Sequence, residues 1–252
     1  MQFSIIIQAR LGSQRLPGKI LKNYKKYNLL DVLIKRLRRS KKVKNIIVAT
    51  TKMKEDDKIK EYCNLNSILY HRGPKNNVLR RYYETAKKFK VKNIVRITSD
   101  CPFIDNKILD FMINLFNKKK IDYLSNTYPE PSTYPDGMDI EIFTFKALKL
   151  ANKYSIKKSE KEHVTVYIRR SGRFKTYRTD LSKDKSKYRL TVDHPNDFVL
   201  FKKIINKFTS RIYTVGMNEI INFLEKNPKF IKYQKKILRN EKFIYDLKRD
   251  KI

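Results

Sequence analysis

Three cations and two glycines follow the first apolar run of the chain. They lie in the segment Gln8–Lys19, which reads QARLGSQRLPGK. The cations are Arg10, Arg15 and Lys19, and the glycines are Gly12 and Gly18. Glycine-rich backbone amides with Arg and Lys side chains bind polyphosphates, although the G-x-x-x-x-G-K-[ST] spacing of a P-loop is absent. A basic surface turn is the alternative, but only six glycines occur in the chain and two fall here, which favours a binding loop.

Two carboxylates stand in matching places further along the chain. Asp100 lies in TSDCP, directly after an apolar run, and Asp193 lies in TVDHP, also after an apolar run. Two carboxylates beside a polyphosphate loop are how proteins hold Mg²⁺ together with the phosphates of a substrate. An Asp that caps a following helix is the alternative for each.

A third acidic segment, Tyr134–Glu141, reads YPDGMDIE. Within it Asp139 and Glu141 share one face of a predicted strand, because side chains alternate along a strand. A ligand-binding role and a solvated acidic edge are equally compatible with this pattern.

Buried strands alternating with helices must position these groups. Short apolar runs predict strands at 3–7, 45–50, 67–70 and 93–98, and helical spacing predicts helices at 29–39, 54–63, 77–89 and 105–119. In the helix at 29–39, Arg36 is expected to face water with Arg38 and Arg39. The alternation predicts an α/β fold with a mostly parallel sheet, whose ligands bind at the carboxyl ends of the strands.

The pattern changes after Tyr123. We expect a loop at 128–135, strands at 139–143 and 188–192, and helices at 144–154, 159–170 and 195–208, the second with a Ser159/Glu162 capping box. Beyond Met217 the chain is helical in pattern and rich in Lys. These features predict one catalytic domain over 1–213 and a basic helical C-terminal extension over 214–252. The Lys-rich tail from Lys226 to Ile252 is expected to be removable with little effect on catalysis.

The charge of +34 raises the alternative of a basic nucleic-acid-binding protein. The cations are spread along the chain, and neither a zinc-finger spacing nor an RNP-type motif is present, so a solvated Lys-rich surface around an enzyme is favoured. Such a surface attracts anionic substrates. Cys63 and Cys101 show no metal-like spacing, and neither a signal peptide nor an apolar run of about 20 residues is seen, so we expect a cytoplasmic protein without a membrane span.

The motifs above, with Glu162-His163-Val164-Thr165, resemble in sequence and order those of the cytidylyltransferases that make CMP-activated acidic sugars. The SpsF-like branch is the most similar, and the acylneuraminate and 3-deoxy-manno-octulosonate cytidylyltransferases are more distant. The resemblance covers roughly Met1 to Phe208. It implies a single nucleotide-diphosphosugar-transferase-like (Rossmann-like) domain.

The resemblance also implies residue roles. The nucleotide, CTP, would be bound by Gln8, Ala9, Arg10, Gly12, Ser13, Arg15, Lys19, Arg72, Asn77 and Ser99. In this set, Arg10, Ser13, Arg15 and Lys19 would contact phosphates, and backbone at Gln8 and Ala9 would help to read cytosine. Asp100 and Asp193 would hold Mg²⁺, and Asp139, Glu141, Glu162 and His163 would face the acceptor. One departure is His194, where an acidic residue is expected.

The implied reaction is attack of an acceptor oxygen on the α-phosphorus of CTP, with loss of pyrophosphate, in surface polysaccharide or glycan biosynthesis. Arg15, Lys19, Asp100 and Asp193 would be catalytic through positioning and charge neutralisation. His163 could act as a base, or could simply pack and form hydrogen bonds. Another nucleoside triphosphate, or a polyol phosphate or phosphonate acceptor, remains an alternative.

A homodimer is also expected. The irregular stretch 128–135 and the apolar positions Phe143, Phe145 and Leu148 suggest more apolar surface than one sheet face needs. The resembling family commonly pairs through the region after its central strands.

Overall fold

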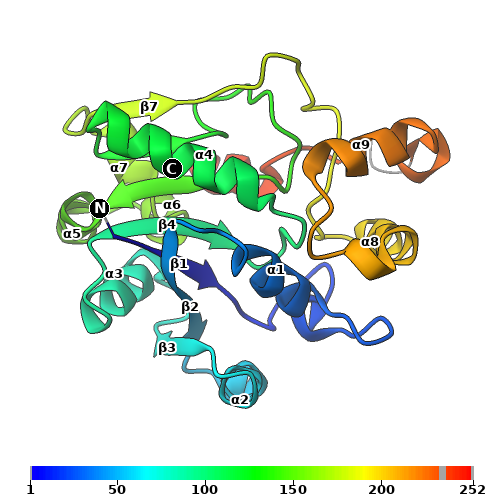
Figure 1. Ribbon diagram of the computed structural model, residues 1–252. Coiled ribbons are helices and arrows are strands. Elements are labelled where there is room, and N and C mark those ends of the chain that lie inside the picture. The colour runs from blue at the N-terminus through cyan, green and yellow to red at the C-terminus, as the bar shows by residue number, and fades with distance from the viewer. Residues whose placement is uncertain (1, 233–236, 251–252) are drawn as a thin grey trace.

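The computed structural model describes residues 2–232 and 237–250 (Figure 1). In this part of the chain one seven-stranded sheet has the order β3-β2-β1-β4-β6-β5-β7. The strands are β1 (Phe3–Gln8), β2 (Val43–Thr51), β3 (Leu69–Gly73), β4 (Asn93–Thr98), β5 (Tyr123–Ser125), β6 (Glu141–Thr144) and β7 (Thr176–Arg178). Strands β1 to β4 are parallel, and β6 runs antiparallel between β4 and β5. The predicted α/β fold with a mostly parallel sheet is confirmed.

Helices connect and cover these strands. They are α1 (Leu29–Leu37), α2 (Asp57–Leu65), α3 (Val78–Lys88), α4 (Asn106–Lys119), α5 (Phe145–Tyr154), α6 (Lys158–Glu162), α7 (Val166–Arg170), α8 (Pro195–Lys207), α9 (Met217–Glu225) and α10 (Glu241–Arg249). Short 3₁₀ turns lie at Lys19–Leu21, Lys54–Asp56, Thr209–Arg211 and Pro228–Phe230.

The helix predicted over 159–170 is interrupted. It forms two short helices, α6 and α7, because Val164 between them has a φ of 57°, which no α-helix accommodates. The Ser159/Glu162 capping box is wrong as well. Glu160 instead accepts hydrogen bonds from the backbone N–H groups of Ile156 and Lys157.

The segment predicted as a strand at 188–192 is an extended coil held to Asp136. The carbonyl of Asp136 accepts hydrogen bonds from the N–H groups of Leu190 (2.6 Å) and Thr191 (3.1 Å). Tyr188, Leu190 and Val192 alternate into an apolar cluster under α8 and α9, which explains the strand-like pattern in the sequence. The sequence therefore predicted correctly which residues of 188–192 are buried, but the prediction that this segment forms a strand was wrong.

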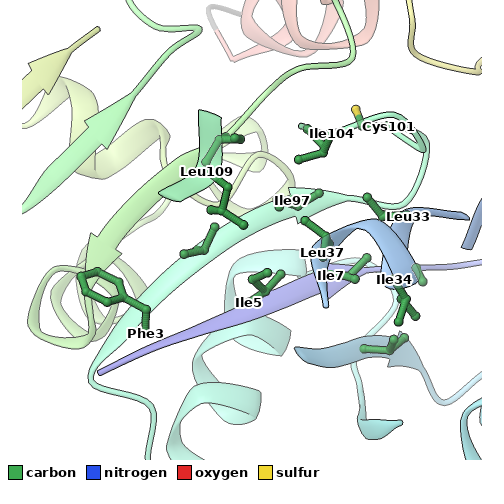
Figure 2. Close-up of a cluster of buried hydrophobic side chains, with 14 of the residues drawn as sticks. Phe3, Ile5, Ile7, Leu33, Ile34, Leu37, Ile97, Cys101, Ile104 and Leu109 are labelled. Carbon is green, nitrogen blue, oxygen red and sulfur yellow. The ribbon is translucent and has the colours of Figure 1, made fainter. Parts of the chain in front are cut away.

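Strand β1 is buried on both faces, as its apolar sequence predicts. On one face Ile5 and Ile7 pack with Leu33 and Leu37 of α1 (Figure 2). On the other face Ile6 packs in a cluster with side chains of α3 and α5. Helices on both faces hold the central strands, and the carboxyl end of β1 with its loop is left free to form a site.

Arg36 corrects the expected solvent-facing side of α1. Its side chain is only 2% exposed, because α1 lies between the sheet and the layer formed by α8 and α9. The guanidinium donates to four backbone carbonyls, those of Phe103, Ile104, Ile212 and Val215, at 2.6–3.1 Å. It thereby ties α1 to two distant turns.

The chain beyond residue 213 shares this core. Met217, Ile220 and Leu224 of α9 are buried in the same cluster as Phe201 of α8, and α8 and α9 lie next to each other in Figure 1. Leu16, near the first loop, belongs to that cluster too. The division at 213 stays a prediction, but α9 has no core of its own.

The apolar positions from which a homodimer is expected lie inside the protomer. Phe143 and Leu148 are fully buried, and Phe145 stacks on Tyr83 with ring centroids 5.8 Å apart. The homodimer therefore stays a prediction without that support. Within residues 2–232 and 237–250, no helix is both long enough and apolar enough to cross a membrane.

Candidate active site

A pocket of about 850 Å³ opens at the carboxyl ends of β1 and β4, where a parallel α/β sheet binds ligands. Segments far apart in the sequence line it: the first loop, the turns after β4 and before β6, the coil at 191–193, α6, α7 and α10. Most of the residues predicted from the sequence meet here: Gln8, Ala9, Arg10, Gly12, Ser13, Arg15, Lys19, Ser99, Asp100, Asp139, Glu141, Glu162, His163 and Asp193.

Backbone contacts bring the two predicted metal-binding carboxylates together. The N–H of Val192 donates to the carbonyl of Asp100 at 2.8 Å, which places Asp193 beside Asp100. Gly137, with a φ of 98°, allows the preceding segment to pass against this coil, since a Cβ there would lie 2.3 Å from the nitrogen of Thr191. A larger residue at 137 would push the coil away from the pocket.

Lys19 bridges these carboxylates. Its Nζ lies 2.6 Å from Asp193 Oδ1, 3.3 Å from Asp100 Oδ2 and 2.7 Å from the carbonyl of Val192. Burial alone would lower the pKa of Lys19, but the two carboxylates outweigh it and raise the pKa. Burial would likewise raise the pKa of Asp100, yet Lys19 and the Thr98 hydroxyl lower it to about 2. Both groups are therefore charged at neutral pH.

Arg15 is the more accessible cation of the loop. Its side chain is 36% exposed, against 8% for Lys19. One guanidinium nitrogen lies 3.0 Å from Asp193, and the other lies 3.0 Å from Glu241 of α10. Because Arg15 opens into the pocket, it is the cation of this pair that an incoming phosphate reaches most directly.

Two further carboxylates, Asp136 and Asp139, lie close to this centre, and their surroundings disfavour the charged form. Burial and the charge of Asp139 raise the pKa of Asp136 to about 7, although Arg189 pairs with it. Burial also raises the pKa of Asp139, and the charges of Asp100 and Glu141 add to the effect against the opposing Arg239. Negative charge is therefore crowded locally around Asp136 and Asp139, although cations and carboxylates both line the pocket.

This local crowding of carboxylates suits a divalent cation. Asp100 and Asp193 supply hard oxygen ligands, and both approach the same cation, Lys19 Nζ, at 3.3 and 2.6 Å. Among residues 2–232 and 237–250, no group of three or more His, Cys, Asp or Glu forms a preformed metal cage. Two carboxylates completed by water and substrate phosphates are the usual way in which proteins bind Mg²⁺, so the residues present suit this ion.

Glu141 is held by hydrogen bonds and an ion pair within the protein. Its carboxylate accepts hydrogen bonds from Tyr123 (2.6 Å) and Thr165 (2.5 Å) and pairs with Arg96. Burial would raise the pKa of Glu141, but Arg96 and Arg169 lower it. This residue is expected from the sequence to face the acceptor; the structure shows it holding β4, β5 and α7 together at the pocket wall.

Two predicted nucleotide-binding residues, Arg72 and Asn77, do not line the pocket. Arg72 donates to the carbonyls of Thr51 and Met53, and Asn77 caps α3 by accepting from the N–H of Arg80 at 2.8 Å. Both side chains make structural contacts here, away from the pocket lining, and their role in nucleotide binding stays a prediction. Their neighbours Lys75, Val78 and Arg81 line the pocket instead.

The backbone expected to read cytosine is partly used by the sheet. The N–H of Ala9 donates to the carbonyl of Ala49 at 3.2 Å, and the carbonyl of Gln8 accepts from the N–H of Ser99 at 3.3 Å. The Gln8 side chain accepts from Arg96 at 3.1 Å. Gln8 and Ala9 thus line the pocket with these groups already paired.

Helix α10 meets the residues predicted to face the acceptor. His163 Nε2 lies 2.8 Å from Asp246, and Glu162 lies 2.5 Å from Lys242 and 3.5 Å from Arg10. Burial lowers the pKa of His163 to about 4 despite the hydrogen bond to Asp246. The imidazole is neutral at pH 7, and with so low a pKa it is a weak general base.

Sequence reasoning missed Arg169, Arg239 and the pocket-facing side of α10. The Arg169 guanidinium lies 3.8 Å from the centroid of the Tyr128 ring and 5.1 Å from that of Phe243. Arg239 pairs with Asp139 at 2.5 Å. The alternation of acidic and basic residues around Phe243 within a Lys-rich tail is the one sequence signal that could have drawn attention to α10.

Several known proteins are similar to this chain in fold or in sequence. The spore coat polysaccharide biosynthesis protein SpsF of Bacillus subtilis is 33% identical over 233 residues, which are 88% of this chain and 94% of that protein. The structure of a cytidylyltransferase from Leptospira borgpetersenii superposes with a TM-score of 0.85 at 37% identity, covering 92% of this chain and 97% of that one. The CMP:2-keto-3-deoxy-manno-octonic acid synthetase, at 15% identity, shares the fold with a TM-score of 0.60 over 82% of this chain and 99% of that one.

The family model described as "Cytidylyltransferase" matches residues 4–244. The match confirms the resemblance seen in the motifs and extends it past Phe208 into α10. With Arg15, Lys19, Asp100 and Asp193 gathered at one end of the sheet, sequence and geometry agree: the chain belongs to the cytidylyltransferase family.

Proposed function

We propose that this protein transfers CMP from CTP to a hydroxyl of an acidic sugar or sugar-like acceptor, with release of pyrophosphate. The observation that carries the proposal is the convergence of Arg15 and Lys19 on Asp100 and Asp193 in one pocket of a cytidylyltransferase-family chain. A role in polysaccharide or glycan biosynthesis is part of the proposal, and the similarity to SpsF of Bacillus subtilis supports it.

The two cations have different tasks. Lys19 is held by three oxygen atoms and keeps the two carboxylates in place. Arg15 presents a guanidinium that can form charge-assisted hydrogen bonds to phosphate oxygens. Charge on the departing pyrophosphate is neutralised at Arg15, and Ser13 and the backbone around Gly12 complete the loop around it.

We also propose that Asp100 and Asp193 hold Mg²⁺. Bound there, the ion would neutralise charge on the phosphates of CTP. The carboxylates themselves orient Lys19 and Arg15. The pKa of Asp100, lowered to about 2, keeps this carboxylate available as a ligand over the physiological pH range.

The acceptor end of the pocket is lined by Asp139, Glu162, His163 and Arg169. Arg169 has no carboxylate within salt-bridge distance among the described residues, so its guanidinium can attract an anionic acceptor. Because His163 is neutral and hydrogen-bonded to Asp246, it orients groups here rather than removing a proton.

The test is a matrix of substrates with pyrophosphate release as the readout. CTP, UTP, ATP and GTP are each offered with Mg²⁺ and one of three acceptor classes: acidic 2-keto sugars, polyol phosphates and phosphonates. We expect release with CTP and an acidic sugar, and a CMP–sugar conjugate by mass spectrometry. Preference for another nucleotide, or for a polyol phosphate or phosphonate, would contradict the proposal.

A homodimer is proposed on family grounds alone. Light scattering at micromolar concentration checks it, and a strictly monomeric mass would count against it.

A further inference from the structure

The segment Ile237–Asp250 lies over the pocket, and five of its polar side chains contact residues beneath it, three of them as ion pairs. Its side chains pair as follows: Arg239 with Asp139 (2.5 Å), Glu241 with Arg15 (3.0 Å), Lys242 with Glu162 (2.5 Å), Asp246 with His163 (2.8 Å), and Asp250 with Ser159. One of these contacts, Glu241 with Arg15, involves the cation that the proposed function assigns to the phosphates.

We infer that the Glu241 carboxylate is an exchange ligand for the phosphate end of the pocket. It occupies Arg15 in the absence of nucleotide, is displaced by the terminal phosphates of CTP, and returns to Arg15 as pyrophosphate departs. No covalent bond changes in this exchange. The inference rests on the proposed function, because it takes pyrophosphate as the leaving product.

The geometry of Arg15 suits an exchange. One nitrogen of its guanidinium is held by Asp193, and the other is on Glu241, so the second can change partner while the first keeps the side chain oriented. Lys19 could not serve in this way, since it is buried and held by Asp100, Asp193 and a carbonyl.

Glu241 is easily released. Its side chain is 54% exposed, and an ion pair at such a position contributes little to stability. Phosphate oxygens bring more negative charge to the same guanidinium and form stronger, charge-assisted hydrogen bonds. The exchange is therefore favourable for a triphosphate or pyrophosphate. CMP, which has no terminal phosphates, does not drive it.

The rest of the helix can stay in place during the exchange. Glu241 is the first residue of α10, while Asp246 and Asp250 attach the helix further along at His163 and Ser159. Rotation of one side chain at the helix start is enough to free Arg15. The aromatic contact between Phe243 and His163, with centroids 4.9 Å apart, further holds the helix.

A second polar group faces the same place. His194 Nε2 is buried without a hydrogen-bond partner among the described residues and lies 4.0 Å from the Glu241 carboxylate. An imidazole N–H at this distance can donate to a phosphate oxygen that replaces the carboxylate. The residue at which the sequence departs from the expected acidic type therefore lies beside the exchange position.

The experiment compares Glu241→Gln with the parent chain by calorimetry, using pyrophosphate, CTP and CMP, each with Mg²⁺. Because the amide competes with phosphates less well than the carboxylate, we expect the dissociation constants of pyrophosphate and CTP to fall about two- to fivefold, the range set by an exposed ion pair. The constant for CMP should stay the same. Pyrophosphate should also become a stronger product inhibitor.

Asp250→Asn is the matched control. It adds the same unit of positive charge and loosens the far end of α10, but it leaves Glu241 on Arg15. We expect it to leave pyrophosphate affinity unchanged. Equal tightening in both variants, or unchanged or weaker pyrophosphate binding in Glu241→Gln, would overturn the inference.

Failure of the proposed function has a different signature. If the parent bound UTP, ATP or GTP in preference to CTP, the cytidylyl assignment would be wrong. The effect of Glu241→Gln on pyrophosphate would still report whether the carboxylate exchanges at Arg15.

Discussion

Lys19 and Asp193 are separated by 174 positions in the sequence, yet Lys19 Nζ donates a hydrogen bond to Asp193 Oδ1 at 2.6 Å. The contact joins the loop after β1 to the coil before α8, and Lys19 is only 7% exposed. A residue that the sequence presents as a phosphate ligand is thus also a buried connection between two halves of the pocket. Substitution should therefore affect stability as well as catalysis.

We expect Lys19→Met to lower the free energy of unfolding by about 2 kcal/mol, because it leaves the partly buried carboxylates of Asp100 and Asp193 side by side without their cation. Arg15→Gln, at a partly exposed ion pair, should cost less than about 1 kcal/mol. Urea denaturation at pH 7 measures both. Similar costs for the two variants would show that Lys19 is no more structural than Arg15.

Asp100→Asn and Asp193→Asn should each reduce turnover by two orders of magnitude or more while the fold is kept. Each amide still accepts a hydrogen bond from Lys19, but it is a poor ligand for Mg²⁺. The deficit should grow as Mg²⁺ becomes limiting. Activity titrated with Mg²⁺ provides the measurement, and parent-like turnover in limiting Mg²⁺ for both variants would refute the metal assignment.

Arg36 offers a test of the fold away from the pocket. Arg36→Met fills much of the same space but leaves four buried carbonyls without their donor, and we expect a loss of about 3 kcal/mol or more. Arg36→Lys should be nearly as damaging, since one ammonium cannot match the planar fork. Arg38→Met, at the exposed residue directly after the same helix, is the control and should change stability by less than about 0.5 kcal/mol.

The buried strands could be predicted because burial on both faces favours largely apolar runs, as in β1. Arg36 could not be predicted, because its burial depends on α8 and α9, which begin 159 and 181 residues later and supply no local signal. The coil at 188–192 shows a second limit of prediction from sequence: the burial pattern does not determine the hydrogen bonding. Its alternating burial is real, but hydrogen bonding to Asp136 replaces a strand ladder.

The site likewise contains some residues whose positions the sequence could predict and some whose positions it could not. That the first loop and Asp100 lie together could be predicted, because both follow strands of the parallel sheet, whose ends converge. Asp193 reaches the same place by another route, from a coil held to Asp136 and Asp100. Arg72 and Asn77 were placed by resemblance alone, and their side chains instead satisfy nearby backbone groups. The role of α10 was hidden because a Lys-rich amphipathic segment reads as a solvated surface unless its partner residues are known.

His163 predicts a pH dependence of stability. Its folded pKa of about 4 lies below the usual value of 6.5, so the unfolded chain binds more protons between these two values. Stability from this group is therefore complete above pH 6.5 and is lost as the pH falls toward 4, by about 3 kcal/mol in all.

His163→Gln keeps a donor for Asp246 but removes the titration. We expect the parent to lose stability relative to this variant as the pH is lowered from 7 to 4.5. Urea denaturation across that range shows it, and a constant difference between the two proteins would mean that His163 protonates as easily folded as unfolded.

The last prediction concerns the end of the chain. From the sequence alone, a protein ending near Asn227 is expected to keep its transfer activity. The structure leads us to expect weaker binding of the acceptor instead. The removed part includes three residues that contact the acceptor end of the pocket: Phe243 beside Arg169, Lys242 on Glu162 and Arg239 on Asp139. Helix α10 contains no fully buried residue, whereas the core residues of α9 are kept, so the shortened chain should still fold.

We expect the KM for the acceptor to rise more than tenfold in the chain ended at Asn227, equivalent to about 1.4 kcal/mol of lost binding, because one wall of the pocket is gone. The affinity for CTP should not fall, because we propose that its phosphates bind the first loop, where the truncation removes Glu241 as a competitor. Phe243→Ala in the full chain removes the aromatic ring beside Arg169 but keeps the charged residues of α10. It should raise the acceptor KM by a smaller factor than the truncation does. Circular dichroism establishes that each variant is folded before kinetics are compared. An acceptor KM equal to that of the parent would mean that α10 covers the pocket without contributing to it, and the sequence-based expectation of a dispensable tail would then be correct.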